Sequence, residues 1–464
     1  MTIDINAFIR EAGSLKPTRR QLDWYDVGYY AFVHFTVNTY TDLEWGLGDE
    51  NEMIFNPTDL NCDEWVEIIK AAGMKGMVLT CKHHDGFCLW PSKYTDHSVK
   101  KSLHFKGGQG DVVREAAEAC RRGGIKFGIY LSPWDRHEKT YGTDAYNDYY
   151  CNTLTELVTQ YGELFMVWLD GACGEGPNGK KQVYDFQRYI EIIRKYQPNA
   201  VISFVDGPDV RWGGNEDGDT RPAEWAVVPG ELCPLSERQT NGKAAEGSLE
   251  GIRSFDANLG QISQLIYSEG LVFAPCEFDM SIRPGWFYHS YEEPHSLDRL
   301  FDTWMRTVGA NAGLNLNIPP MPNGRIDPRD IQRAKELGDK LQAEFGNPLA
   351  SEWKRIDKAA DGSTQQADST QAVFEITLPQ VQKIRYIELR EDIAQGQRVE
   401  CFHVRCEPVF DHVAKGTSIG YRKISRLHHY KDGVGMVDWV ETDRLTVRIT
   451  SSRGPVCMKD IILY

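Results

Sequence analysis

The chain has 464 residues, of which 41% are hydrophobic and 26% are charged, and its formal net charge is −15. Its length exceeds that of one typical domain, and its composition is ordinary for a globular protein. Nucleic acids and anionic membranes bind basic surfaces, so the negative charge argues against both as partners.

The eleven cysteines are scattered and include no CxxC pair, so the sequence indicates neither a zinc site nor a redox motif. Free thiols fit a reducing compartment. The first residues, MTIDINAFIREAG, lack the apolar core of a signal peptide, and no apolar run is long enough to cross a membrane. We therefore expect a cytoplasmic protein, or a periplasmic or secreted one if a signal peptide has been removed, and leave its oligomeric state open.

Apolar runs alternate with amphipathic segments along most of the chain. After a helix at 5–12, the runs that predict strands lie at 29–38, 75–87, 126–135, 164–172, 200–207, 271–280 and 310–320. The segments that predict helices lie at 63–73, 111–124, 146–162, 181–198, 296–309 and 328–346. The sixth strand is the least visible, and we assign it to the run WAVV at 225–228.

This alternation predicts an α/β fold, a (β/α)8 barrel over residues 1–348, with an open doubly wound sheet as the alternative. No GxGxxG follows the first strand, so dinucleotide binding has no support. Beyond the polar stretch AADGSTQQADSTQ, four runs alternate with a period of two, namely VFEITLP, KIRYIELRE, VECFHVRC and LTVRITSS. They predict an antiparallel β-sandwich over residues 349–464.

The stretch WLDGA at 168–172 ends the apolar run of the fourth predicted strand. In barrels and open α/β sheets, chemistry takes place at the carboxyl ends of the strands. Asp170 is therefore the first candidate for a catalytic carboxylate. The alternative is an aspartate that only caps the following helix or turn.

Other polar and aromatic side chains stand at the ends of neighbouring predicted strands, namely His34, His83, His84, Tyr130, Trp134 and Trp168. Together they place hydroxyl-binding groups and indole rings around one mouth, which is the composition of a monosaccharide pocket. A metal site is the competing use of the histidines. Because adjacent His83 and His84 on a strand would point to opposite faces, we rank metal catalysis below sugar binding.

Hydrolysis of a glycoside needs a second carboxyl group, which is protonated while the first is ionised. Spacing alone does not choose among the acidic residues of the loops, namely Glu44, Glu216, Asp217, Glu224, Glu277 and Asp279. Each of them can instead be a solvated loop residue, which is the commonest fate of Asp and Glu.

Six motifs together resemble glycoside hydrolase family 29, the retaining α-L-fucosidases. They are HFTVNTYTDLEWG, CKHHDGFCLWPSKYTDHSV, FGIYLSPW, VWLDGA, RWGGNEDG and SIRPGWFYH. The similarity covers residues 24–320, which is the whole predicted barrel. It implies an exo-α-L-fucosidase that acts on a fucosylated oligosaccharide or glycan and needs neither a cofactor nor a metal ion.

The resemblance also implies roles for single residues. Asp170 matches the family's nucleophile. RWGGNEDG and SIRPGWFYH resemble the branch that prefers α-1,3/1,4 linkages, in which the Glu of the NED loop, here Glu216, is the general acid/base. Such a retaining double displacement implies carboxyl groups about 5–5.5 Å apart.

The resemblance extends to the binding of the sugar. The positions that match fucose-binding residues are His34, Glu44, His83, His84, Tyr130, Trp168 and Trp286. Arg211 and Trp212 match the aglycone side, and Trp90 is expected to pack with Trp286 on the apolar sugar face. The β-sandwich resembles the one that accompanies these barrels, and we assign no ligand to it.

Three alternatives stay open. The first is the broad-specificity branch of the family, which acts on α-1,2 and aryl fucosides and carries its acid/base on a less regular loop. The second is a fucose-binding module that has lost catalysis, although retention of both Asp170 and Glu216 argues against it. The third is a metal-dependent hydrolase on the same barrel.

Overall fold

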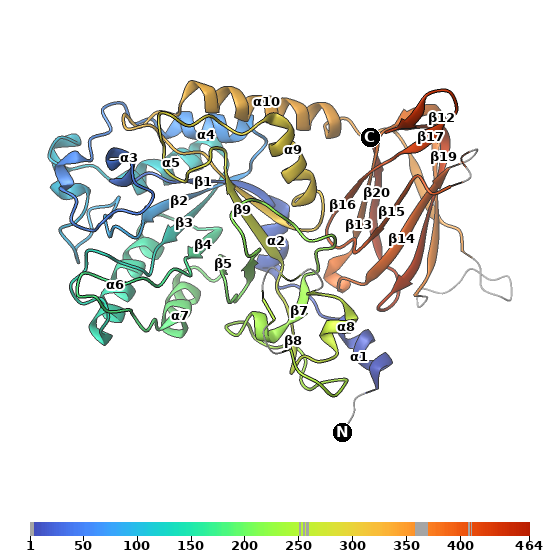
Figure 1. Ribbon diagram of the computed structural model, residues 1–464, viewed down its shortest axis with the longest axis horizontal. Helices are drawn as coiled ribbons and strands as arrows, with labels where there is room; N and C mark the ends of the chain where they lie inside the picture. The colour runs from blue at the N-terminus through green and yellow to red at the C-terminus, as the bar shows by residue number, and fades with distance from the viewer. Residues whose placement is uncertain are drawn as a thin grey trace.

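Two units follow one another along the chain, a barrel and a β-sandwich (Figure 1). The structure, a computed structural model, describes residues 4–249, 252–253, 256, 259–357, 370–406, 409 and 411–464. Within those ranges, no helix combines the length and the apolar composition that crossing a membrane requires.

Eight parallel strands close the barrel in the order β1-β10-β9-β6-β5-β4-β3-β2. They are β1 (Tyr29–Val33), β2 (Gly76–Lys82), β3 (Lys126–Leu131), β4 (Met166–Leu169), β5 (Val201–Phe204), β6 (Val210–Trp212), β9 (Cys276–Ser281) and β10 (Gly313–Asn317). Because β1 pairs with both β2 and β10, the sheet has no free edge. The predicted barrel is confirmed, and the open sheet is excluded.

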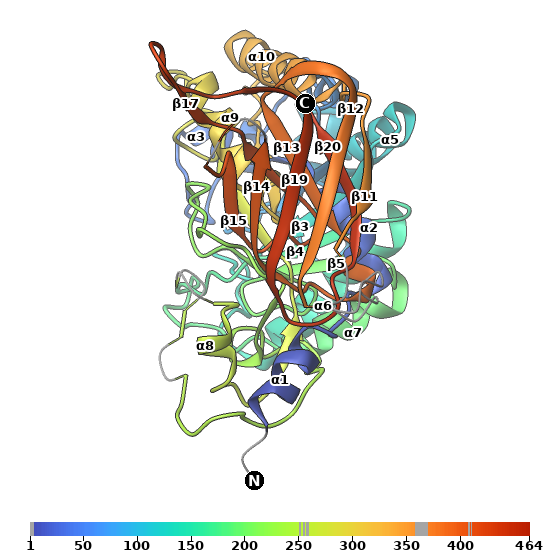
Figure 2. The ribbon, with the colours of Figure 1, turned by 90° about the vertical axis from the view of Figure 1, so that its right-hand side faces the viewer.

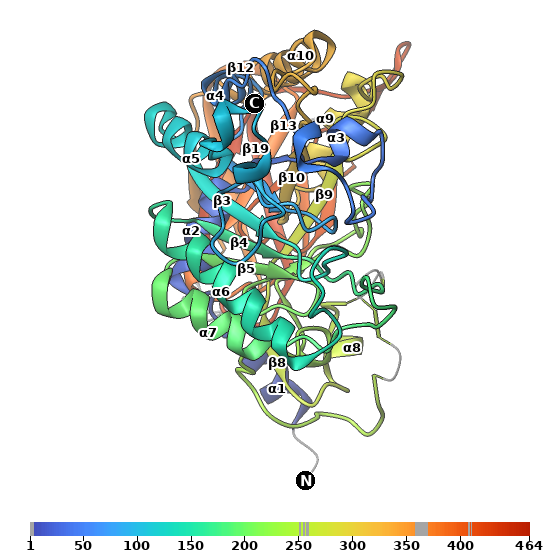
Figure 3. The ribbon, with the colours of Figure 1, turned by 90° about the vertical axis from the view of Figure 1, so that its left-hand side faces the viewer.

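Helices cover the outside of the barrel (Figure 3). They are α4 (Cys62–Ala71), α5 (Val112–Gly123), α6 (Asp144–Gln160), α7 (Phe186–Tyr196), α9 (Leu297–Arg306) and α10 (Pro328–Phe345). Two further helices, α1 (Ile5–Ala12) and α2 (Arg19–Val27), precede the first strand, and the short α3 (Asn38–Thr41) and α8 (Ile262–Leu265) lie in loops. Side chains of Asn61, Asp111 and Asp185 accept the N-terminal backbone N–H bonds of α4, α5 and α7. With its cap at Asp185, α7 begins five residues later than the sequence predicted.

The sixth barrel strand is a correction. The predicted run at 225–228 lies outside the barrel, where β7 (Val227–Pro229) pairs with β8 (Leu271–Phe273) in a separate two-stranded sheet. The barrel strand is β6, which follows β5 after residues 205–209 with no helix between them. A strand of three residues is too short to show a periodic pattern, which is why the sequence did not reveal it.

Two antiparallel sheets form the C-terminal unit (Figure 2). One sheet has the order β11 (Glu352–Arg355), β12 (Ala372–Ile384), β19 (Val440–Ser452), β14 (Val399–Cys406) and β15 (Ala414–Thr417). The other has the order β16 (Lys423–Arg426), β13 (Tyr386–Glu391) and β20 (Met458–Leu463). In addition, β17 (His429–Lys431) and β18 (Gly435–Val437) form a hairpin. Apolar side chains of both sheets form one buried cluster, so the predicted sandwich is confirmed.

The chain passes from the barrel to the sandwich between α10 and β11. Helix α10 ends at Phe345, and β11 begins at Glu352. The polar stretch predicted at 359–371 lies outside the described residues as far as 369. Side chains of the sandwich reach the barrel loops, since Gln397 Nε2 and Ser418 Oγ both donate to the carbonyl oxygen of Glu224.

Candidate active site

The predicted strand-end residues meet at one end of the barrel. His34 follows β1 directly, His83 and His84 follow β2, and Asp170 follows β4. Parallel strands in a closed barrel all present their carboxyl ends to the same mouth, so neighbours in the barrel become neighbours in the site. These side chains therefore form one cluster although they come from different parts of the sequence.

Asp170 is held at this mouth by two donors. The hydroxyl of Tyr130 donates to Asp170 Oδ2 at 2.7 Å, and the N–H of Ala172 donates to Oδ1 at 2.7 Å. His84 Nε2 lies 4.0 Å from Oδ2. The hydrogen bond from Ala172 is the local turn contact that the sequence left open as an alternative. The contacts with Tyr130 and His84 come from other strands and orient the carboxylate, and 21% of the Asp170 side chain stays exposed.

The three imidazoles of the mouth are in a neutral form. Burial lowers the pKa of His34 to about 3 and that of His84 to about 4, and it lowers the pKa of His83 well below its ordinary value. A neutral imidazole donates from one ring nitrogen and accepts at the other, and a sugar hydroxyl can pair with either nitrogen. These histidines therefore suit the binding of a neutral polar ligand.

The ring of His34 is oriented by Asn317 on β10. Asn317 Nδ2 donates to the carbonyl oxygen of Trp286 at 2.7 Å, so its Oδ1 is the acceptor for His34 Nδ1 at 2.8 Å. In the same way, Ser132 Oγ donates to the carbonyl oxygen of Trp134 and accepts from His84 Nδ1 at 2.7 Å. Both histidines thus present Nε2 as an acceptor.

The expectation that His83 and His84 point to opposite faces is wrong. Their rings lie side by side with centroids 4.1 Å apart and planes tilted by 38°, because β2 ends at Lys82 and the chain no longer follows strand geometry. Even so, the described residues include no group of three or more His, Cys, Asp and Glu side chains placed to hold a metal ion.

Aromatic rings form the floor and one wall of the mouth. Trp168 stacks on Tyr130 with centroids 5.4 Å apart, and Phe32 meets both rings edge-on. The ring of Trp286 lies 5.0 Å from that of His34. The arrangement offers apolar surface beside hydroxyl-binding groups, as a monosaccharide pocket requires.

Glu216 lies on the rim, in a loop shaped by Asn215. The Asn215 Oδ1 accepts the backbone N–H groups of Asp217 at 3.1 Å and Asp219 at 3.0 Å. Trp286 Nε1 donates to Glu216 Oε2 at 3.0 Å. Desolvation raises the pKa of Glu216, the charge of Asp170 raises it further, and the bond from Trp286 lowers it. The net pKa is raised, which favours a protonated carboxyl group.

Glu44 joins the cluster by holding the segment that carries Trp286. Its carboxylate accepts the backbone N–H of Trp286 at 2.8 Å and of Phe287 at 3.2 Å, and His289 Nε2 lies 2.7 Å from it. These bonds occupy much of the carboxylate, so Glu44 has a structural role beside the sugar contact predicted for it.

Two predicted site residues do not belong to this cluster. Trp90 is buried in the core, where its indole N–H donates to Glu156 of α6 at 2.8 Å. Arg211 is buried and pairs with Glu224 at 3.0 Å, on the side of β6 that faces away from the barrel interior. Both assignments are corrected: each side chain already has its partners elsewhere in the fold.

Trp45 was not singled out from the sequence, whereas Asp279 was one of the acidic candidates. Trp45 is 58% exposed and meets the rings of His84 and Trp134 edge-on, with centroids 6.0 and 5.6 Å away. Its position directly after Glu44 in the motif LEWG is the signal that could have found it. Asp279 lies inside the barrel and accepts from Trp212 Nε1 at 2.7 Å, and burial raises the pKa of Asp279 to about 8.

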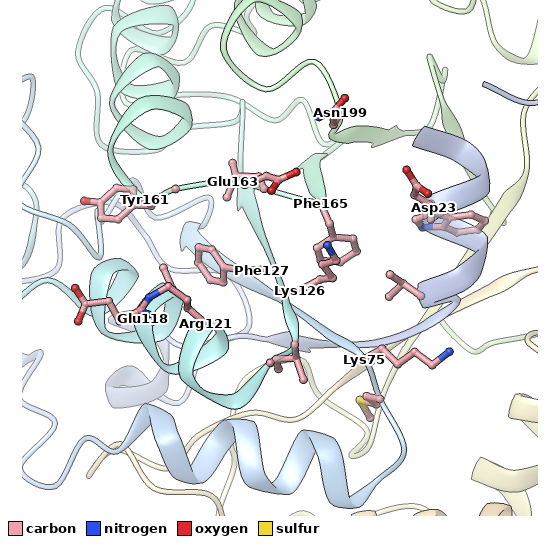
Figure 4. A pocket seen from close by; sticks show the side chains of 18 of the residues that line it. Asp23, Lys75, Glu118, Arg121, Lys126, Phe127, Tyr161, Glu163, Phe165 and Asn199 are labelled. Atoms are coloured by element: carbon pink, nitrogen blue, oxygen red, sulfur yellow. The ribbon is translucent and has the colours of Figure 1, made fainter. Parts of the chain in front are cut away.

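A large hollow lies at the opposite end of the barrel (Figure 4). It measures about 1160 Å³ and is lined near the amino ends of β2, β3 and β4 by side chains of both charges, among them Asp23, Lys75, Glu118, Arg121, Lys126 and Glu163. Barrel enzymes place their chemistry at the carboxyl ends of the strands. We therefore assign the candidate site to the mouth that holds Asp170.

Comparisons with known proteins find relatives of this chain. The family model Alpha-L-fucosidase matches residues 14–344. Alpha-L-fucosidase 1 of Arabidopsis thaliana is 37% identical over 456 residues, covering 92% of this chain and 86% of its own length. A solved structure from Bacteroides ovatus ATCC 8483 has a TM-score of 0.87 at 39% identity and covers 100% of this chain and 76% of its own. A glycoside hydrolase 29 family member from an unknown rumen bacterium has a TM-score of 0.79 at 34% identity, covering 97% of this chain and 77% of its own.

Proposed function

The chain belongs to the α-L-fucosidases of glycoside hydrolase family 29, and on that premise we propose that it is a retaining exo-enzyme that removes terminal α-1,3/1,4-linked L-fucose from branched glycans. The observation that carries the proposal is the pair of carboxyl groups at the barrel mouth. Asp170 accepts two hydrogen bonds, which stabilise a carboxylate, whereas the surroundings of Glu216 raise its pKa. Two carboxyl groups in such different environments suit a nucleophile and an acid.

The mechanism is a double displacement. The ionised Asp170 attacks the anomeric carbon while Glu216 transfers its proton to the departing glycosidic oxygen. Glu216 then takes a proton from water, and this water breaks the fucosyl–Asp170 bond and releases fucose with its configuration retained. The hydroxyl of Tyr130, 2.7 Å from Asp170, and the neutral histidines orient the nucleophile and the sugar without adding charge.

The linkage preference rests on the acid loop. RWGGNEDG and SIRPGWFYH resemble the α-1,3/1,4 branch, and Glu216 and Trp286, one from each motif, are joined by a hydrogen bond of 3.0 Å. This contact supports a fixed acid on the rim, beside the position of the leaving group. The broad-specificity branch is the second candidate, and the choice between them is experimental.

We would test the function by measuring fucose release from three substrates, a branched Lewis-type trisaccharide, an α-1,2-linked fucosyl disaccharide and an aryl fucoside. Release from the trisaccharide alone, or nearly so, is expected. Efficient release from all three would contradict the linkage preference and reopen the assignment of Glu216. Release from none would revive the fucose-binding module.

The raised pKa of Glu216 predicts where activity declines on the alkaline side. Glu216 must be protonated to act as the acid, and an acid with a raised pKa keeps its proton to higher pH. The alkaline limb of kcat/KM is therefore expected above the value of about 4.3 for an ordinary glutamate. The measurement is kcat/KM of the branched trisaccharide against pH, for the wild type and for Glu216→Gln, whose residual activity should lack this limb.

Asp279 is the competing group, because its pKa of about 8 lies on the same side of the profile and both catalytic carboxyl groups act on it. Asp279→Asn is therefore the control, and we expect it to keep the alkaline limb. A limb that persists in Glu216→Gln and disappears in Asp279→Asn would contradict the assignment of the acid to Glu216.

A further inference from the structure

Glu277 is a buried carboxyl group inside the barrel that the mechanism does not use. It lies on β9, fully shielded from solvent, and three side chains from other elements approach it. Trp168 Nε1 and Ser203 Oγ donate to its Oε1, the latter at 3.1 Å, and the hydroxyl of Tyr30 is bonded to its Oε2. Each carboxyl oxygen thus has a partner on a different barrel strand.

No lysine or arginine pairs with Glu277 in the part of the chain that the structure describes. Burial raises the pKa of Glu277 well above its ordinary value, and the charge of Asp279 raises it further. A buried carboxyl group without a cation costs folding free energy that an apolar side chain of similar size would not cost. Because Glu277 is costly for stability, we look for its function in the hydrogen bonds that it accepts.

The bond to Trp168 leads directly to the nucleophile. Trp168 lies on β4, two residues before Asp170, and stacks on Tyr130, with the rings 5.4 Å apart and inclined by 26°. Tyr130 in turn donates to Asp170 at 2.7 Å. The orientation of the Trp168 indole therefore affects the position of the Tyr130 ring, which in turn positions Asp170.

The other side of Glu277 is anchored to the base of the barrel. Trp24 Nε1 on α2 donates to the hydroxyl oxygen of Tyr30 at 2.9 Å, and this hydroxyl is bonded to Glu277. The carboxyl group thus links a fixed aromatic pair below it to the pocket wall above it. A side chain held on both sides can set the plane of the indole within a narrow range.

We infer that Glu277 is a positioning residue of the active site, which fixes the indole of Trp168 by a hydrogen bond and thereby holds the Tyr130–Asp170 contact in its reactive geometry. The inference rests on the proposed function, since it assigns Glu277 a part in the work of Asp170. It requires hydrogen bonding by the side chain rather than its charge.

The test compares two substitutions at this position. Glu277→Gln keeps the shape, an acceptor for Trp168 and a donor for the Tyr30 oxygen, and is expected to retain kcat/KM for the branched trisaccharide within about threefold. Glu277→Leu removes the bonds at similar volume and is expected to lose between about 10-fold and about 100-fold, the scale of a small misplacement of reacting groups. The loss should appear in kcat more than in KM.

Glu156 offers a matched control. It is also buried and also accepts from an indole, that of Trp90 at 2.8 Å, together with Ser92 Oγ at 2.8 Å, but it lies against the core outside the mouth. Glu156→Leu should lose stability in the same way, measured as a lower Tm, while the folded protein keeps kcat/KM within about threefold of the wild type. An equal loss of activity in both leucine variants would overturn the inference, because stability alone would explain it.

Trp168→Phe tests the same bond from the other side and serves if Glu277→Leu does not fold. It keeps an aromatic ring but removes the N–H, so a loss similar to that expected for Glu277→Leu is predicted, and in the double variant the losses should not add. Wild-type kcat/KM in folded Glu277→Leu, additive losses in the double variant, or a Glu277→Gln variant as impaired as Glu277→Leu would each overturn the inference.

The wild type, assayed alongside, distinguishes a failure of the inference from a failure of the proposed function. An inactive wild type contradicts the proposed function, whereas an active wild type with an unaffected Glu277→Leu contradicts the positioning role alone.

Discussion

Replacement of Asp170 by alanine is expected to lower kcat by about 10⁴-fold or more, the scale on which enzymes lose activity when a nucleophile is removed. The side chain is the one carboxylate in the described part of the mouth that receives both the Tyr130 hydroxyl and a backbone N–H. Without it, no covalent fucosyl intermediate can form. The measurement is steady-state turnover of the branched trisaccharide by Asp170→Ala.

Binding and stereochemistry separate this loss from misfolding. Asp170→Ala should still bind L-fucose by calorimetry, because the histidines and the aromatic rings remain in place. Azide can enter the space left by the carboxylate and attack from the same side, so any rescued product should be β-L-fucosyl azide, with inverted configuration. Ordinary turnover in this variant would refute the assignment of the nucleophile.

Glu216→Ala is expected to show the second largest effect, a loss of about 10²–10⁴-fold in kcat/KM on the branched trisaccharide, the usual contribution of a general acid/base. A sugar leaving group needs a proton as it departs, whereas a phenolate of low pKa leaves without one. The loss should therefore be much smaller on an aryl fucoside with a good leaving group. Parallel kinetics of Glu216→Ala on both substrates provide the measurement.

The product formed with azide gives an independent criterion. In Glu216→Ala the fucosyl enzyme still forms on Asp170, so azide should rescue turnover and yield α-L-fucosyl azide, with retained configuration. Asp217→Ala is the matched control, since Asp217 is the exposed neighbour in the same loop and pairs only loosely with Arg299, at 3.6 Å. Equal losses on every substrate without azide rescue, or an equally large effect in Asp217→Ala, would argue against Glu216 as the acid/base.

Local patterns in the sequence were sufficient for most of the barrel. The predicted helices at 63–73, 111–124 and 328–346 correspond to α4, α5 and α10, because each combines an apolar face with a capping side chain at its start. Buried parallel strands appear as continuous apolar runs, which is why β1, β2 and β4 were visible. Since the ends of such strands meet, the position of Asp170 and its histidine neighbours followed from the fold class.

Other predictions needed partners that lie far away in the sequence. Trp90 and Trp286 both follow apolar segments, yet the first donates to Glu156 in the core and the second to Glu216 on the rim. Nothing local distinguishes two such indoles. The acid/base assignment, the linkage preference, the oligomeric state and the cellular compartment stay predictions.

The sequence by itself determined the fold class, the strand-end cluster and the candidate nucleophile, because periodicity and the order of elements report burial along the chain. Only the tertiary structure decided which side chains each carboxyl group contacts. It brought Glu277 to Trp168 across more than a hundred residues, turned Arg211 towards Glu224, and placed the rings of His83 and His84 next to each other. These contacts depend on the closure of the barrel and on the direction in which each side chain points at its edge. The pattern of neighbouring residues in the sequence reports neither of these.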